Sequence, residues 1–289
     1  MDIISTKKFF LWKQKQISKG GDNKNLNLLI DSLGGLSDRE LNLIKIRSDS
    51  NVNLMIDLDL LESIWETHLN TSIPIQYLSG ISFWRDLKLG VSNKVLIPRS
   101  ETEIIIEIVS DLFKEKQKGI IFADLGTGSG AISIALALAN PYWEGIATDI
   151  DKQALKIAST NFSKCSEQSN LRFYCGNWWE PLKNFKGVLD LAIANPPYIP
   201  NNVYEKLPIE VKNFEPKIAL LGGEDGLDHI KEIIQYAPQY LKEKGWLLIE
   251  NHFDQSGKVK ELFIENGFVA VKVLKDFSGI GRFTIGRYK

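Results

Sequence analysis

Apolar, strand-like runs alternate with helical segments from Gly119 to the end of the chain. Such an alternation predicts an α/β fold with a doubly wound, mostly parallel sheet and helices on both of its faces. The last two runs should form a terminal strand pair around the polar turn 276–281. Expected strands cover residues 120–125, 145–149, 171–175, 189–194, 246–250, 268–274 and 282–286, and expected helices cover 131–139, 152–162, 226–241 and 255–266.

Residues 1–80 have a different, helical pattern. The sequence from Ser37 to Glu40 is that of a capping box opening a helix through Ile46. Asp59 to Glu62 resembles a second capping box, which would open a helix over 60–69. We expect these helices to pack into a small domain, which could either dock a substrate or serve the folding of the larger domain.

The period changes to that of strands between residues 81 and 97. The runs 83–91 and 94–97 read as a hairpin turning around Ser92 and Asn93. The segment that follows leads into an apolar helix over 104–113, for which Ser100 or Thr102 could supply the cap. The expected organisation is therefore a helical domain over 1–80, a β-hairpin linker over 81–104 and the α/β domain over 105–289.

Composition narrows the class of protein. Of the 289 residues, 44% are hydrophobic and 25% are charged, and no run of about 18 apolar residues could span a bilayer. The N-terminus has neither a secretory nor a transit pattern, and two cysteines do not make a disulfide framework, so we expect a cytoplasmic protein. A net charge of −1 weighs against stable nucleic-acid binding. The three histidines lack metal-ligand spacing, so no metal site is expected.

A glycine loop follows the first strand of the α/β region, at Gly126, Gly128 and Gly130. Glycines there let the chain turn sharply and let a ligand approach the backbone, and Asp149 at the end of the next strand can accept hydrogen bonds from ribose hydroxyls. The G-x-G-x-G spacing departs from the dinucleotide fingerprint. Asp124, just before the loop, would suit a ligand with an ammonium group better than one with phosphates.

The tetrapeptide Asn195-Pro196-Pro197-Tyr198 ends the apolar strand 189–194. Two prolines stiffen the backbone, so that the Asn195 amide and the Pro196 carbonyl are held side by side at the carboxyl end of a strand. This pair can accept two hydrogen bonds from one NH2 group. A turn that merely closes a core strand is the plainer interpretation of the same residues.

Together these motifs resemble a class I S-adenosylmethionine-dependent methyltransferase that acts on a planar amide or exocyclic nitrogen. More narrowly, the chain resembles the HemK family, the glutamine N5-methyltransferases of peptide chain release factors. The resemblance covers about residues 73–289 and rests on 76–77, 95–103, 195–198, 215–220, 222–226 and 276–282. Ser100 departs from it, because the family usually has proline there.

The resemblance implies a seven-stranded, Rossmann-like methyltransferase domain preceded by a small helical domain and a β-hairpin. It also implies S-adenosylmethionine as the cofactor and the glutamine of a Gly-Gly-Gln motif in release factors as the substrate. The cofactor residues it implies are Gly126, Thr127, Gly128, Ser129, Gly130, Asp149, Asn177, Trp178 and Asn195.

An amide nitrogen is a poor nucleophile, so positioning should do most of the catalytic work. We expect Asn195 and the Pro196 carbonyl to hold the substrate NH2 and Tyr198 to pack on the flat amide, with Pro197 completing the substrate site. Arg99 and Glu101 would shape the pocket, or serve only as a surface pair and a helix cap.

Two alternatives stay open at this point. The same tetrapeptide could hold the amino group of adenine (N6) or guanine (N2), which would make the protein a nucleic-acid methyltransferase requiring base flipping. The chain could also be a silent S-adenosylmethionine-binding adaptor.

Overall fold

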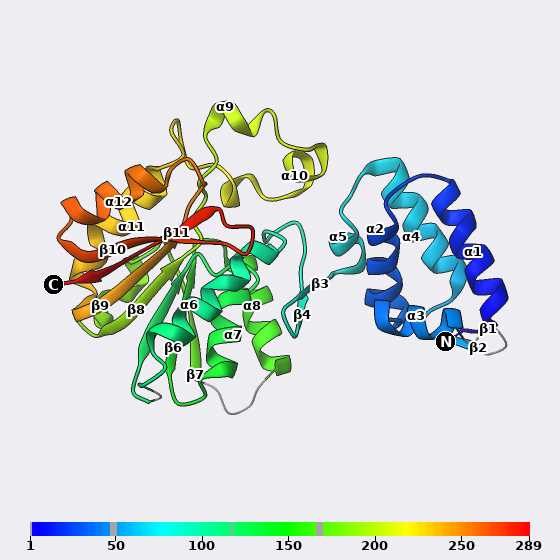
Figure 1. Cartoon of the computed structure of the whole chain (residues 1–289), viewed down its shortest axis with the longest axis horizontal. Helices are drawn as coiled ribbons and strands as arrows, with labels where there is room; N and C mark the ends of the chain where they lie inside the picture. Colours follow the sequence, from blue (N-terminus) through cyan, green and yellow to red (C-terminus); the bar gives the residue numbers. More distant parts are fainter. Residues whose placement is uncertain (1, 47–50, 117, 166–169) are drawn as a thin grey trace. The chain divides into compact units, whose positions relative to one another are not determined.

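The computed structural model describes residues 2–46, 51–116, 118–165 and 170–289 (Figure 1). The chain divides into two compact units. One comprises Met1–Ser82 and Ile209–Phe214, and the other comprises Phe83–Pro208 and Glu215–Lys289.

The second unit is built on a seven-stranded sheet, which confirms the predicted α/β fold. The strand order is β10-β11-β9-β8-β5-β6-β7, in which β9 to β7 are parallel and β10 and β11 are antiparallel. The strands are β5 (Ile121–Leu125), β6 (Glu144–Asp149), β7 (Asn170–Cys175), β8 (Leu189–Ala194), β9 (Leu241–Glu250), β10 (Phe268–Lys275) and β11 (Gly281–Tyr288).

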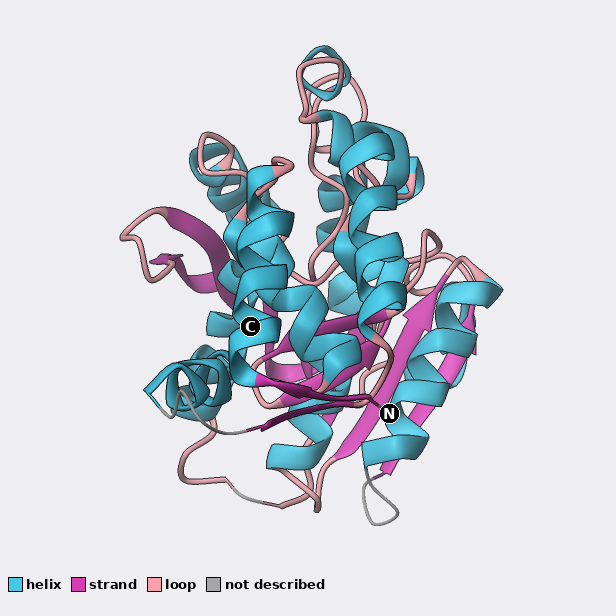
Figure 2. Ribbon diagram, turned by 90° about the vertical axis from the view of Figure 1, so that its right-hand side faces the viewer, coloured by secondary structure: helices cyan, strands magenta, loops and turns pink. Residues whose placement is uncertain are grey.

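Two hydrophobic cores lie on the two faces of this sheet. Successive residues of β8 alternate between them, with Leu191 and Ile193 in one core and Ala192 and Ala194 in the other, and all six residues of β8 are buried. A strand buried on both faces needs an almost continuous apolar sequence, as predicted here. Figure 2 distinguishes the strands, in magenta, from the helices, in cyan. The first core contains residues of α6 (Ile104–Leu112) and α7 (Ala131–Ala139), with α8 (Lys152–Cys165) beside it, and the second contains residues of α11 (Asp228–Tyr236) and α12 (Ser256–Glu265).

The helix α11 is shorter than the predicted 226–241. It gives way to a 3-10 turn, Ala237–Gln239, that contains Pro238, and β9 already begins at Leu241. Proline interrupts the helical hydrogen-bond ladder, so the chain turns there and enters the sheet earlier than predicted. The remaining short helical segments of this unit are η3 (Glu180–Phe185), α9 (Asn201–Tyr204) and η4 (Lys217–Ala219), whereas α10 (Ile209–Phe214) belongs to the first unit.

The predicted hairpin turn around Ser92 and Asn93 is wrong. The paired strands are β3 (Ile81–Trp84) and β4 (Leu87–Gly90), and the turn is the dipeptide Arg85-Asp86, with Arg85 at a φ of +50°. A two-residue turn whose first residue has a positive φ matches the twist of the flanking strands. Residues 94–97 form no strand and are available to line a cavity instead.

The predicted cap of the helix over 104–113 is also wrong. Residues Ser100–Glu103 form a 3-10 turn (η2) that runs into α6, and neither hydroxyl caps the helix. The Thr102 hydroxyl donates instead to Glu250, 2.8 Å away at the end of β9, and that of Ser100 donates to Glu101.

The first unit has its own core, formed by large side chains such as Phe9, Leu61 and Trp65. The capping box of Ser37 is present: its backbone N–H donates to Glu40 Oε2 at 2.8 Å, and its hydroxyl accepts from Glu40 N. The unit contains β1 (Asp2–Ser5) paired with β2 (Asn51–Leu54), a pair that the helical pattern did not predict. Its helices are α1 (Thr6–Ser18), α2 (Asn23–Leu29), the π-helical η1 (Ile30–Gly34), α3 (Asp38–Ile46), α4 (Leu58–Thr71) and α5 (Ile75–Ser79).

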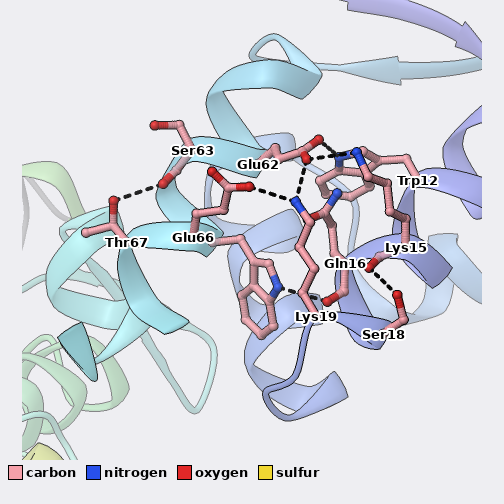
Figure 3. A network of polar contacts seen from close by, with 10 residues as sticks. Trp12, Lys15, Gln16, Ser18, Lys19, Glu62, Ser63, Glu66 and Thr67 are labelled. Atoms are coloured by element: carbon pink, nitrogen blue, oxygen red, sulfur yellow. Dashed lines mark hydrogen bonds and ion pairs between the residues drawn. The ribbon is translucent and has the colours of Figure 1, made fainter. Parts of the chain in front are cut away.

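Glu62 does not form the second predicted capping box, because α4 begins earlier, at Leu58. Figure 3 shows its carboxylate turned toward α1, where it accepts hydrogen bonds from Trp12 Nε1 at 3.0 Å, Lys15 at 3.3 Å and Lys19 at 2.6 Å. The Lys19 bond contributes most to holding the pKa of Glu62 down to about 2. Glu62 therefore joins two helices rather than capping one.

Candidate active site

The carboxyl ends of four adjacent parallel strands open onto one cavity. The chain runs from β5 outward to β7 and returns on the other side of β5 as β8, so the strand order reverses between β5 and β8. Open α/β sheets bind ligands at such a reversal. The wall of this cavity includes Gly126 after β5, Asp149 of β6, Gly176 after β7 and Asn195 after β8.

The glycine loop has the conformation that its sequence predicts. Gly126 and Gly130 have φ values of +76° and +86°, a region that favours glycine. A Cβ atom on Gly126 would lie 2.8 Å from the Trp178 ring, and one on Gly130 would lie 2.8 Å from Ile134. Gly128 differs, because a Cβ there would meet no atom within 4 Å. Gly128 lines the cavity, so its bare backbone is open to a ligand.

Asp149 lies at the cavity wall and braces the glycine loop. Its Oδ2 accepts from Gly128 N at 2.9 Å and its Oδ1 accepts from Asp151 N at 2.9 Å. Burial raises the pKa of this carboxyl above its ordinary value, against the lowering effect of the backbone N–H groups. Each carboxylate oxygen has a further lone pair that can accept from a ligand hydroxyl.

Asp124 does not face the cavity, contrary to the expectation that it could meet a ligand's ammonium group. Its side chain is buried behind the loop, where Oδ2 accepts from the Thr127 hydroxyl at 2.6 Å. Its Oδ1 has no hydrogen-bond partner among the described residues, and burial raises its pKa to about 6. The residue shapes the loop from inside the core.

An aromatic wall closes another side of the cavity. Trp178 has a φ of +41°, lies over Gly126 and contacts the His229 ring, with the ring centroids 5.5 Å apart. Its indole N–H is buried without a partner among the described residues, so it can donate to a bound group. Asn177 beside it donates through Nδ2 to Glu232 at 2.9 Å, which leaves its oxygen as an acceptor.

Asn195 presents its carboxamide at the end of β8. Its Nδ2 donates to Thr102 Oγ1 at 3.2 Å, whereas neither its Oδ1 nor the Pro196 carbonyl receives a hydrogen bond from the described residues. The Tyr198 hydroxyl donates to Glu250 Oε1 at 3.3 Å, and the Tyr198 carbonyl accepts from Gln255 Nε2 at 2.9 Å. The loop after β8 is thus held by hydrogen bonds to Thr102, Glu250 and Gln255, while Asn195 Oδ1 and the Pro196 carbonyl remain unused as acceptors.

Arg99 and Glu101 separate. Arg99 lines the cavity and donates through Nη2 to Glu215 Oε1 at 2.6 Å, while its carbonyl accepts from Trp84 Nε1 at 2.7 Å. Glu101 is exposed and does not line the cavity. Arg99 is therefore held by a buried acid distant in sequence and not by its neighbour.

Most residues predicted for the site do lie on the cavity wall. Those are Gly126, Thr127, Gly128, Ser129, Asp149, Asn177, Trp178, Asn195, Pro197 and Arg99, whereas Gly130, Pro196, Tyr198 and Glu101 are not on it. In the described part of the chain, no three His, Cys, Asp or Glu residues are grouped to hold a metal ion. The helices described include none that is both long and apolar enough to cross a membrane.

Comparison with known proteins assigns the chain to a family. The family model "Methyltransferase small domain" matches residues 102–207. The release factor glutamine methyltransferase of Prochlorococcus marinus is 42% identical over 97% of this chain and 96% of its own length. That of Thermosynechococcus vestitus is 37% identical over 91% and 90%. This chain belongs to the release factor glutamine methyltransferase family.

Solved structures agree with this assignment at the level of the fold. The catalytic domain of hMettl16, determined in complex with MAT2A 3'UTR hairpin 1, has a TM-score of 0.56. It is 16% identical to this member of the family and covers 82% of this chain, with 83% of its own chain matched. At this identity the likeness shows a shared methyltransferase fold.

Sequence reasoning missed several cavity residues of this family member. His229, Ile218 and Ala219 come from segments that carry no catalytic pattern, and Thr102 had been considered only as a helix cap. Segment 94–98, predicted in part as a strand, also lines the wall. One signal in the sequence could have found Ile218 and Ala219. They lie in 215–220, which, like 222–226, was noted as a family motif without a structural role.

Proposed function

We propose that this chain transfers a methyl group from S-adenosylmethionine to the side-chain amide nitrogen (N5) of the glutamine in the Gly-Gly-Gln motif of peptide chain release factors. The observation that carries the proposal is the free acceptor of Asn195, on the cavity wall that it shares with the glycine loop. The family assignment supports the same substrate, because the relatives named above are release factor glutamine methyltransferases.

The cavity fits S-adenosylmethionine. The bare backbone at Gly128 admits a ligand closely, Asp149 can accept from ribose hydroxyls, and Trp178 offers both an aromatic face and an unpaired N–H to an adenine ring. Asn177 has an oxygen free to accept from an amino group. When bound, this cofactor supplies a methyl group on a positively charged sulfur, which becomes a neutral thioether on transfer.

The substrate amide is held by acceptors at the end of β8. Asn195 Oδ1 and the Pro196 carbonyl accept hydrogen bonds from the two N–H groups of the glutamine side chain, which turns its nitrogen toward the methyl group. Methylation of the nitrogen would be accompanied by the loss of one amide proton to water, so that the product amide is neutral. The two acceptors stabilise the positive charge that develops on nitrogen. Tyr198 lies beside them with its hydroxyl engaged by Glu250.

Asn195 and its surroundings require no strong general base. The amide N–H becomes acidic only while the methyl group arrives, so a solvent molecule suffices to remove the proton. Arg99 and Pro197 line the same cavity, and in this proposal they belong to its substrate site. We place the reaction in the cytoplasm, where release factors act on ribosomes.

The test is transfer of labelled methyl from S-adenosylmethionine to a purified release factor. The parallel acceptors are the same factor with its Gly-Gly-Gln motif changed to Gly-Gly-Ala, and duplex DNA. We expect label on the unmodified factor alone, and loss of labelling with Asn195→Ala. Asn266→Ala is the matched control, because its amide donates to Leu262 at the end of α12, outside the cavity wall.

Label on DNA would reassign the protein to nucleobase methylation. Label on the Gly-Gly-Ala factor would move the modified position elsewhere in the release factor. Absence of label on every acceptor, with S-adenosylmethionine bound, would favour the silent adaptor.

A further inference from the structure

A line of buried polar groups continues behind Asn195 into the protein. Asn195 Nδ2 donates to Thr102 Oγ1 at 3.2 Å, and the Thr102 hydroxyl donates to Glu250 Oε2 at 2.8 Å. Thr102 is 5% exposed and Glu250 is 2% exposed, so water does not compete for these bonds. Asn195 directly follows β8, Thr102 lies in η2 and Glu250 ends β9, so the three residues are far apart in sequence and meet only in the fold.

The chemistry of this line decides which way the Asn195 amide faces. A hydroxyl has one hydrogen, and that of Thr102 is committed to the Glu250 carboxylate. Thr102 can then only accept from Asn195, so the NH2 group must face Thr102. The opposite orientation would place the carboxamide oxygen against the lone pairs of the hydroxyl, with no hydrogen between the two oxygen atoms.

We propose that Thr102 and Glu250 are positioning residues for methyl transfer, which hold the Asn195 carboxamide with its oxygen toward the substrate NH2. This inference rests on the proposed function, because only a substrate that donates two N–H bonds needs Asn195 as an acceptor. With the amide reversed, two NH2 groups would face each other and the substrate would lose one of its two acceptors.

Glu250 must be a carboxylate to fix the line in this direction. The ionisable and charged groups that face it are the Tyr198 hydroxyl, Arg282 of β11 and Glu101 of η2. Arg282 is itself bound to Asp276, with Nε 2.7 Å from Oδ2. Burial outweighs the hydrogen bonds from Thr102 and Tyr198 and raises the pKa of Glu250 to about 7. A protonated Glu250 can donate to Thr102 and so free the hydroxyl to donate to the Asn195 oxygen.

The experiment compares Thr102→Val, which keeps the shape and removes the hydroxyl, with Thr102→Ser, which keeps the hydroxyl. The full chain is assayed for kcat and KM with a purified release factor, and for the Kd of S-adenosylmethionine. We expect Thr102→Val to lower kcat/KM for the release factor by about 10- to 100-fold while the Kd of S-adenosylmethionine changes by less than about twofold. Thr102→Ser should recover most of the lost activity.

A second variant gives a readout that a purely structural role would not change. The wild-type kcat/KM should fall as the pH is lowered through about 7, since Glu250 then gains a proton. Glu250→Gln should have a flat profile in this range, because its side chain does not ionise. This variant also serves if Thr102→Val fails to fold.

Equal activity of Thr102→Val and the wild type would overturn the inference, as would a Thr102→Ser variant as defective as Thr102→Val. An inflection near pH 7 that persists in Glu250→Gln would remove Glu250 from the account. A wild-type enzyme that labels no release factor would instead refute the proposed function itself.

Discussion

Replacing Glu250 by glutamine should make the dependence of stability on pH measurably different from that of the wild type. Burial raises the pKa of Glu250 from an ordinary value of 4.5 to about 7. An acid whose pKa is raised in the folded state stabilises the fold at low pH, where it is protonated in both states. That advantage is lost as the pH rises from 4.5 through about 7, because the folded protein must then carry a buried charge.

The size of the effect follows from the two pKa values. Each tenfold change in proton affinity corresponds to about 1.4 kcal/mol, so moving from 4.5 to about 7 costs the folded state about 3 kcal/mol at alkaline pH. The free energy of unfolding of Glu250→Gln, minus that of the wild type, should therefore increase by about 3 kcal/mol between roughly pH 4.5 and pH 8.5. Taking this difference cancels the contributions of groups common to both proteins.

Denaturant unfolding followed by circular dichroism at several pH values measures this difference. Glu144→Gln is the matched control: Glu144 also ends up on a strand of the sheet, but its side chain is 47% exposed in a surface pair with Arg172. Its difference from the wild type should vary by less than about 1 kcal/mol over the same range. A difference for Glu250→Gln that stays constant with pH would refute the claim that burial governs its ionisation.

Three further predictions concern the cavity wall and the first unit. Gly128→Ala should weaken S-adenosylmethionine binding by more than about tenfold, because the added methyl group occupies the space of the ligand. Gly267→Ala is the control, because Gly267 has a positive φ and equally open surroundings but lies outside the cavity wall, so its affinity for S-adenosylmethionine should not change. Isothermal titration calorimetry compares the two variants, and equal affinities would count against ligand contact at Gly128. Trp178→Phe should keep the aromatic face but remove the unpaired indole N–H. We expect the affinity for S-adenosylmethionine to fall by roughly 3- to 30-fold in the same titration. An unaltered affinity would mean that the indole N–H stays unpaired in the complex. Glu62→Gln should lower the free energy of unfolding at neutral pH by no more than about 1 kcal/mol, because the ion pairs of the partly exposed Glu62 carboxylate are screened by water. This loss should vanish as the pH falls from 4.5 toward about 2, where the wild-type carboxylate becomes protonated. A loss in denaturant titrations that does not depend on pH would show that the charge of Glu62 does not cause it.

Local patterns were sufficient to predict most of the sheet. Strands such as β8 are buried on both faces and so consist of almost continuous apolar sequence. Such a run identifies a strand whichever strands it pairs with. The hairpin was misplaced because 81–97 contains several short apolar stretches, and the turn was decided by the backbone conformation of Arg85. The pairing of β1 with β2 joins residues about fifty positions apart, and nothing in either short segment identifies its partner.

The residues of the site also differ in whether local sequence patterns could predict them. Gly126, Asp149 and Asn195 could be predicted because each follows or ends a strand, and strand ends of a parallel sheet meet at one edge. Thr102 and His229 could not, since their places depend on how distant segments pack. Thr102 in particular has a residue type and a position that suit a helix cap, and only the presence of Glu250 beside it shows that its hydroxyl is used elsewhere.

The position of β11 has a consequence for the order in which the enzyme matures. β11 is the last strand in sequence, yet it lies between β9 and β10 in the sheet. While the chain is being synthesised, β9 therefore emerges with one edge unpaired, although the glycine loop, Asn195 and Thr102 are already available. Glu250 lies at the end of this strand, which is then paired with β8 alone, and Arg282 has not yet been synthesised. A nascent chain should consequently acquire its cofactor-binding loop before it acquires a rigid acceptor for the substrate, and activity should arise only once β11 has been inserted.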